Sequence, residues 1–183
     1  MRDAVHEALN FAYERTIDQD AAFGFRQLED IAVKALSPGV NDPVTATHAI
    51  GHMSDLLVTL CGRRLGPTLH TDAAGKGRLI IPDRDLRYYL DLACGQVRRY
   101  GAGEPTVLTA LLTMLRDVAA AVRDDEQREE VECQVGHIVA EIPSSTPDHD
   151  VEPIHDMAER VQLVLAGRIR RGFTDRSGET RST

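Results

Sequence analysis

Apolar side chains recur at helical spacing along most of this chain, and that periodicity restricts the fold more than any other feature. The segment 107–122 is the most apolar, with Val and Leu residues three or four positions apart on one helical face, as at a bundle centre. Comparable stripes occupy six further segments: 3–15, 24–36, 42–64, 84–100, 124–142 and 154–169. Amphipathic helices bury their apolar faces against one another, which predicts an all-α fold, a bundle of about seven helices.

One segment, near residues 67–82, departs from the helical pattern. Two short runs, 68–71 and 78–81, flank a loop that contains glycine, which predicts a short β-hairpin. We expect residues 1–172 to form a single helical domain. Residues 173–183 form a polar tail without an apolar run to offset the entropy of ordering, and we expect this tail to be disordered.

Composition excludes several classes of protein. Lys and Arg number 21 against 29 Asp and Glu, and the net charge of −8 disfavours a nucleic-acid partner. The N-terminus has charges where a signal peptide needs an apolar core, and no apolar stretch approaches the ~20 residues that span a bilayer. Cys61, Cys94 and Cys133 fall in apolar-periodic segments, which predicts buried, reduced thiols. These features favour a soluble, cytoplasmic protein.

A polar signature runs through residues 15–46. Its most specific part is Ala-Leu-Ser-Pro-x-x-Asn-Asp-Pro-x-Thr-Ala at 35–46. The signature resembles that of the domain of unknown function 2254 family, which are predicted bacterial membrane proteins, and a weaker likeness extends over most of residues 1–142. The resemblance implies membrane helices N-terminal to this region and a place on the cytoplasmic face of the membrane in a longer parent chain. It implies no reaction. An excised domain and a stand-alone relative both fit the sequence.

Eight polar residues of this signature are candidates for binding a ligand or partner: Arg15, Gln19, Asp20, Asp30, Ser37, Asn41, Asp42 and Thr45. Part of the set has a structural explanation, since Asp42 is a natural N-cap and Pro43 suits the first position of a helix. Arg15 and Asp20 could pair with each other, or with Asp30 and Asp42, in a structural network. The alternative is that the carboxylates hold a divalent cation or a small polar ligand near one helix N-terminus.

A second candidate site is the pair His48 and His52, with Asp55 three residues further along the same helix. Two histidines at i and i+4 can share one metal ion. No Glu follows His48 as in the His-Glu-x-x-His motif, so a solvated or interface face is the competing interpretation. The sequence identifies no cofactor.

These observations favour a non-enzymatic module that assembles or regulates the membrane region of a parent protein and associates with itself as a homo-oligomer. No complete catalytic constellation is present in the sequence. One alternative is a small-ligand sensor with a pocket between the 37–42 loop and the following helix. Another is a metal-assisted hydrolase that uses Asp20, Asp30 and Asp42, or His48 and His52.

Overall fold

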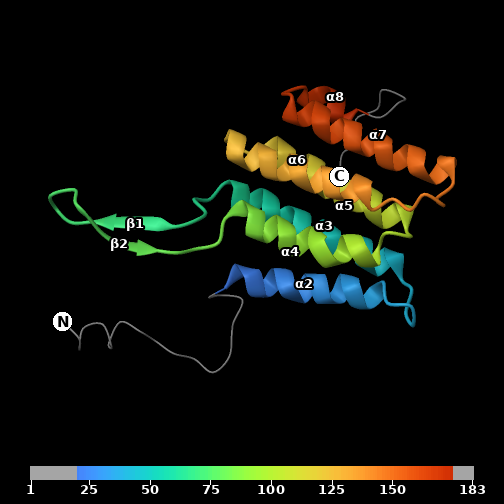
Figure 1. Cartoon of the computed structure of the whole chain (residues 1–183), viewed down its shortest axis with the longest axis horizontal. Helices are drawn as coiled ribbons and strands as arrows, with labels where there is room; N and C mark the ends of the chain where they lie inside the picture. The colour runs from blue at the N-terminus through green and yellow to red at the C-terminus, as the bar shows by residue number, and fades with distance from the viewer. Residues whose placement is uncertain (1–19, 175–183) are drawn as a thin grey trace.

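The computed structural model describes residues 20–174, and these form a helical bundle with one β-hairpin (Figure 1). The helices are α2 (Ala21–Ala35), α3 (Pro43–Cys61), α4 (Leu86–Tyr100), α5 (Pro105–Ala121), α6 (Asp125–Ala140), α7 (Asp148–Leu165) and α8 (Ile169–Phe173). Strands β1 (Thr68–Thr71) and β2 (Gly77–Ile81) pair antiparallel. The predicted all-α fold with a hairpin near 67–82 is confirmed. The predicted helix at 3–15 and the tail from 175 onward lie outside the described residues.

Helix α5 occupies the centre of the bundle, as its apolar sequence predicts. It packs against α3, α4, α6 and α7, whereas α2 covers α3 and α4 from one side and α8 lies on α7. The leucines of α5 at positions 108, 111, 112 and 115 are at most 1% exposed. Burial of these side chains against four neighbouring helices contributes to the hydrophobic stabilisation of the fold, together with the buried apolar faces of the other helices.

Aspartates begin four of the helices. The side chains of Asp20, Asp42, Asp85 and Asp124 each accept a backbone N–H from the first turn of α2, α3, α4 and α6 respectively. A carboxylate at this position satisfies a free amide and complements the positive end of the helix dipole. These caps explain why local sequence defines the helix starts well.

The predicted apolar stripe at 154–169 extends over two helices, α7 and the start of α8. Gly167 adopts a φ of +76°, a left-handed conformation that glycine tolerates, and the chain turns there before α8 begins. Ile169, which the stripe places on the buried face, is 50% exposed. Phe173, the first residue of the predicted polar tail, packs against the core, and the Arg116 guanidinium lies 4.3 Å from its ring centre.

Two residues that the apolar patterns place in the core are exposed: Ile31, within the stripe at 24–36, and Cys133. Ile31 is 48% exposed, whereas its neighbour Glu29 is 5% exposed, because Glu29 lies on the same helical face as Phe25 and Ala32. Cys133 is exposed on the outer face of α6. The buried residues Val131 and Gln134 lie on the opposite, core-facing side of this helix.

The other two cysteines are buried free thiols, as predicted. Burial disfavours the thiolate and raises the pKa of Cys61 to about 11 and that of Cys94 to about 12. Both thiols are therefore protonated packing groups and not reactive nucleophiles.

Candidate functional site

Asp20 links the start of α2 to the chain that returns from the hairpin. Its Oδ1 accepts the backbone N–H of Ala22 at 3.1 Å, and its carboxylate forms an ion pair with Arg84, whose Nη2 lies 3.3 Å from Oδ2. The hydrogen bond to Asp20 raises the pKa of Arg84 above its ordinary value. The Arg84 guanidinium also lies 5.0 Å from the ring centre of Tyr88. The carbonyl of Arg84 accepts the N–H of Gly66 at 3.0 Å and closes the base of the hairpin.

The loop from Ser37 to Asp42 is a compact turn whose polar groups bond locally. The Ser37 carbonyl accepts the N–H of Asn41 at 2.9 Å, and Asn41 adopts a left-handed φ of 49°. Asp42 accepts the backbone N–H of Thr45 at 3.0 Å and its hydroxyl at 2.6 Å. These two hydrogen bonds, the hydroxyl first, lower the pKa of Asp42. The turn therefore has a structural role in joining α2 to α3.

The structure does not bring the three carboxylates of the signature together. Asp20 and Asp42 stand at opposite ends of α2, a helix of 15 residues, which spans ~22 Å. Asp30 lies between them on the exposed surface of α2. A cation site shared by Asp20, Asp30 and Asp42 is therefore excluded on geometry. Arg15 and Gln19 lie outside the described residues.

The structure does bring His48, His52 and Asp55 to one groove. This groove, of about 500 Å³, runs between α3 and α5, and Thr113 and Asp117 line its opposite wall. Both histidines are exposed. Within residues 20–174, no three His, Cys, Asp or Glu side chains are close enough to hold one metal ion. The groove therefore offers polar contacts but not a complete metal-binding set.

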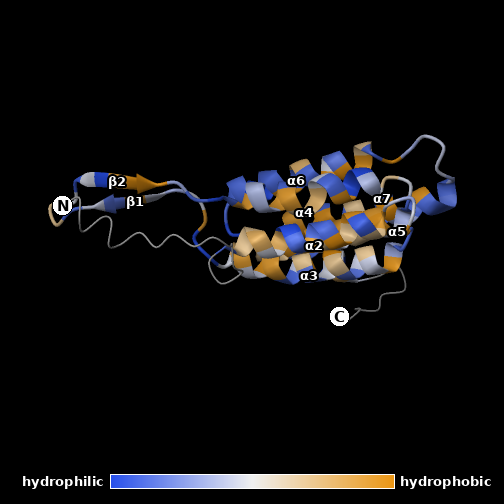
Figure 2. Cartoon of the chain, turned by 90° about the horizontal axis from the view of Figure 1, so that it is seen from below, coloured by the Kyte–Doolittle hydropathy of each residue, from blue (hydrophilic) through white to orange (hydrophobic). Residues whose placement is uncertain are grey.

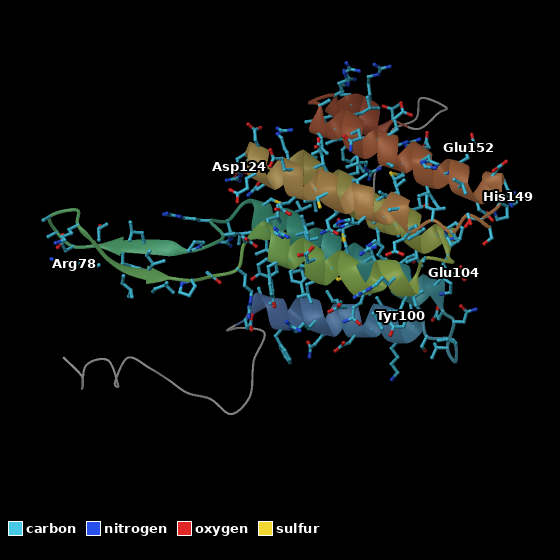
Figure 3. All side chains as sticks on the ribbon, in the orientation of Figure 1. Arg78, Tyr100, Glu104, Asp124, His149 and Glu152 are labelled. Carbon is cyan, nitrogen blue, oxygen red and sulfur yellow. The ribbon has the colours of Figure 1, made fainter. Side chains whose placement is uncertain are left out.

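A charged recess of about 310 Å³ lies where the hairpin leaves the bundle, and the sequence analysis did not anticipate it. Its walls combine arginines with carboxylates from the starts of α4 and α6: Arg63, Arg64, Arg87, Asp85, Asp124, Glu126 and Glu130. Asp124 marks this end of α6 (Figure 3). Charges of both signs in one recess offset one another, so the recess has no strong preference for an anion or a cation.

The hairpin is the most unusual surface of the described chain. It projects from the end of the bundle, and its second strand is strongly apolar (Figure 2). Leu69 is 54% exposed, and Leu79, Ile80 and Ile81 are 56%, 64% and 46% exposed. Leu69 pairs with Ile80, and His70 pairs with Leu79. Because side chains alternate across a strand, the apolar residues lie on both faces of the hairpin.

The tip of this hairpin is nevertheless well ordered by hydrogen bonds. Asp72 accepts the backbone N–H groups of Ala74 at 2.9 Å and Lys76 at 3.0 Å, and the Nε of Arg78 donates to it at 2.7 Å. These bonds lower the pKa of Asp72. Figure 3 shows Arg78 near the tip. The turn therefore fixes the strand register although nothing in the described chain covers either face.

These features define an all-α domain with an uncovered β-hairpin, and none of its described helices has the length and apolarity needed to span a bilayer. The model of the family described as "Predicted membrane protein (DUF2254)" matches residues 1–117, so the chain belongs to this family. The matched region ends within α5 and includes the signature and the hairpin.

Similar proteins are known from mycobacteria. The uncharacterized proteins Mb1321c of Mycobacterium bovis and Rv1290c of Mycobacterium tuberculosis are each 41% identical to this chain over 131 residues. The alignment covers 72% of this chain but 25% of each relative, so the chain spans about a quarter of their length. No solved structure matches the chain.

Proposed function

We propose that this chain is a non-enzymatic assembly module, in which the hairpin joins one copy to a second copy. The observation that carries the proposal is the apolar exposure of the hairpin on both faces. Monomeric proteins rarely expose such clustered apolar side chains, and clusters of this kind mark interaction sites. Among residues 20–174 no strand pairs with either outer edge of the hairpin, and open strand edges are ready templates for pairing with another chain.

Strand number supports a second copy as the occupant. A two-stranded hairpin by itself is at best marginally stable in water, and independent stability needs three or more strands. The four- and five-residue strands of this hairpin have no third strand among the described residues. Two hairpins from two copies supply four strands and cover apolar side chains of both.

The family and the length of the relatives support a place for this module within a larger membrane protein. The family is one of predicted membrane proteins, and the mycobacterial relatives are about four times as long as the matched region. We therefore propose that the module assembles or regulates the membrane region of a parent protein. Free thiols at Cys61 and Cys94 support a position on the cytoplasmic side, where thiols stay reduced.

Sedimentation equilibrium of the purified chain tests this function. We expect the wild type to associate, and Leu79→Lys and Ile80→Lys, one on each face of the hairpin, to weaken association by ~tenfold or more because each loses one buried apolar side chain. Ile31→Lys is the matched control, since Ile31 is a similarly exposed residue on α2. A monomeric wild type, or equal association of all four proteins, would refute the proposal. Circular dichroism verifies that every variant keeps the bundle.

A further inference from the structure

Cys133 and His137 form an exposed pair one helical turn apart on α6. The Sγ of Cys133 lies 3.7 Å from the Nε2 of His137. Neither residue contributes to the bundle core, and neither belongs to the hairpin or to the signature at 15–46. Both are side chains that bind zinc.

The separation of the two atoms matches that of two ligands on one zinc ion. With zinc–sulfur at ~2.3 Å, zinc–nitrogen at ~2.0–2.1 Å and a tetrahedral angle, the sulfur and nitrogen ligands lie ~3.6 Å apart. The observed 3.7 Å therefore requires almost no rearrangement for a zinc ion to bridge Sγ and Nε2. Helical i, i+4 spacing places both ligands on the same face of α6.

We propose that Cys133 and His137 are half of a tetrahedral Cys2His2 zinc site, which the same pair from a second copy completes. Within residues 20–174, no third His, Cys, Asp or Glu joins this pair, so the described part of one copy supplies two of the four ligands. Each bound thiol releases its proton to solvent, so one zinc ion displaces two protons from two chains.

The surface beside the pair is shaped for close approach of another helix. Gly136 is exposed in the interior of α6, and a Cβ atom at this position would contact nothing within 4 Å. Glycine inside a helix costs stability relative to alanine, and no close contact with the described residues requires it here. Without a side chain at Gly136, the backbones of two α6 helices can approach closely enough for the four ligands to meet.

Charge makes this association depend on the metal. The exposed face of α6 also carries Asp125, Glu126, Glu129 and Glu132. Two such acidic faces repel each other, and a divalent cation between them offsets the repulsion. The α6 contact is therefore expected to form with zinc and to separate on chelation, unlike association through the hairpin.

The test is a zinc titration of the full chain, kept reduced with a phosphine, and followed by native mass spectrometry. We expect one zinc per two chains. Cobalt(II) in place of zinc should give the visible absorption of a tetrahedral ion and a thiolate charge-transfer band. Cys133→Ser and His137→Ala should each weaken binding by ~tenfold or more, because each removes two of the four ligands from the dimer. The matched control is His48→Ala/His52→Ala, which removes the other i, i+4 pair and should bind zinc as the wild type does.

Three results would overturn the inference: one zinc per monomer, no zinc at all, or binding that the Cys133→Ser variant retains. Leu79→Lys separates this inference from the proposed function. That variant loses hairpin association but should still dimerise when zinc is added. If the hairpin does not mediate association, zinc-dependent dimerisation can still be measured. If zinc does not bind, association through the hairpin can still be measured.

Discussion

Glu29 is a carboxyl side chain on the core-facing side of α2, between Phe25 and Ala32 at helical spacing. Burial disfavours its charged form and raises its pKa, while a hydrogen bond from Gln96 on α4 acts in the opposite direction. Hydropathy alone places Ile31 in the core instead of Glu29. Helical geometry decides which residue is buried, because position 29 continues the stripe and position 31 does not.

We predict that Glu29→Gln raises the free energy of unfolding at pH 7. The folded-state pKa of Glu29 is above its ordinary value of 4.5, so the folded state binds the proton more strongly and loses stability as pH rises through that pKa. Glutamine has no charge to desolvate. The gain should fall within the ~0.5–3 kcal/mol range of single substitutions.

Urea denaturation at pH 7 and pH 4 measures this effect. The difference between Glu29→Gln and wild type should shrink at pH 4, where the carboxyl is protonated. Glu159→Gln, at an exposed carboxyl on α7 that does not act on Glu29, is the control and should change little at either pH. A Glu29→Gln variant less stable than wild type at pH 7 would contradict the prediction.

At the scale of elements, local sequence predicts helix boundaries well and long-range pairs poorly. The segments 24–36, 42–64 and 84–100 are close to the observed α2, α3 and α4, because signals such as the break at Pro38 and the cap at Asp42 act within a few residues. Asp20 pairs with Arg84, which lies 64 positions away in the sequence. Only the packing of α2 beside the hairpin base reveals that pair.

A double-mutant cycle on Asp20→Asn and Arg84→Met tests the link between α2 and the hairpin base. Both side chains are less than a third exposed, so we expect a coupling energy of about 1 kcal/mol in urea denaturation. The control cycle uses Asp72 and Arg78, whose arginine is 61% exposed, and should give a coupling near zero. Additive effects of the Asp20 and Arg84 substitutions would show that the ion pair does not hold these elements together.

For the whole molecule, periodicity predicts the bundle because the apolar faces of seven amphipathic helices can be buried against one another. The central position of α5 follows from its continuous apolar face.

The candidate site was less predictable from the sequence than the fold. The sequence indicates polar residues at 15–46, but those within the described chain serve caps, turns and the Asp20–Arg84 pair. The consecutive apolar residues of β2 were a signal for an interface, since a half-buried strand shows alternation instead. Whether a helix covers the hairpin depends on how all the helices pack in three dimensions, which local sequence does not reveal.

Amide hydrogen exchange measured over a range of protein concentrations tests the proposed hairpin interface most directly. The isolated hairpin opens readily in water, whereas a four-stranded sheet formed by two copies protects its amides. We predict that protection of Thr68–Thr71 and Gly77–Ile81 rises with protein concentration while that of α5 stays constant. Exchange at the hairpin that is independent of concentration would contradict assembly through this surface.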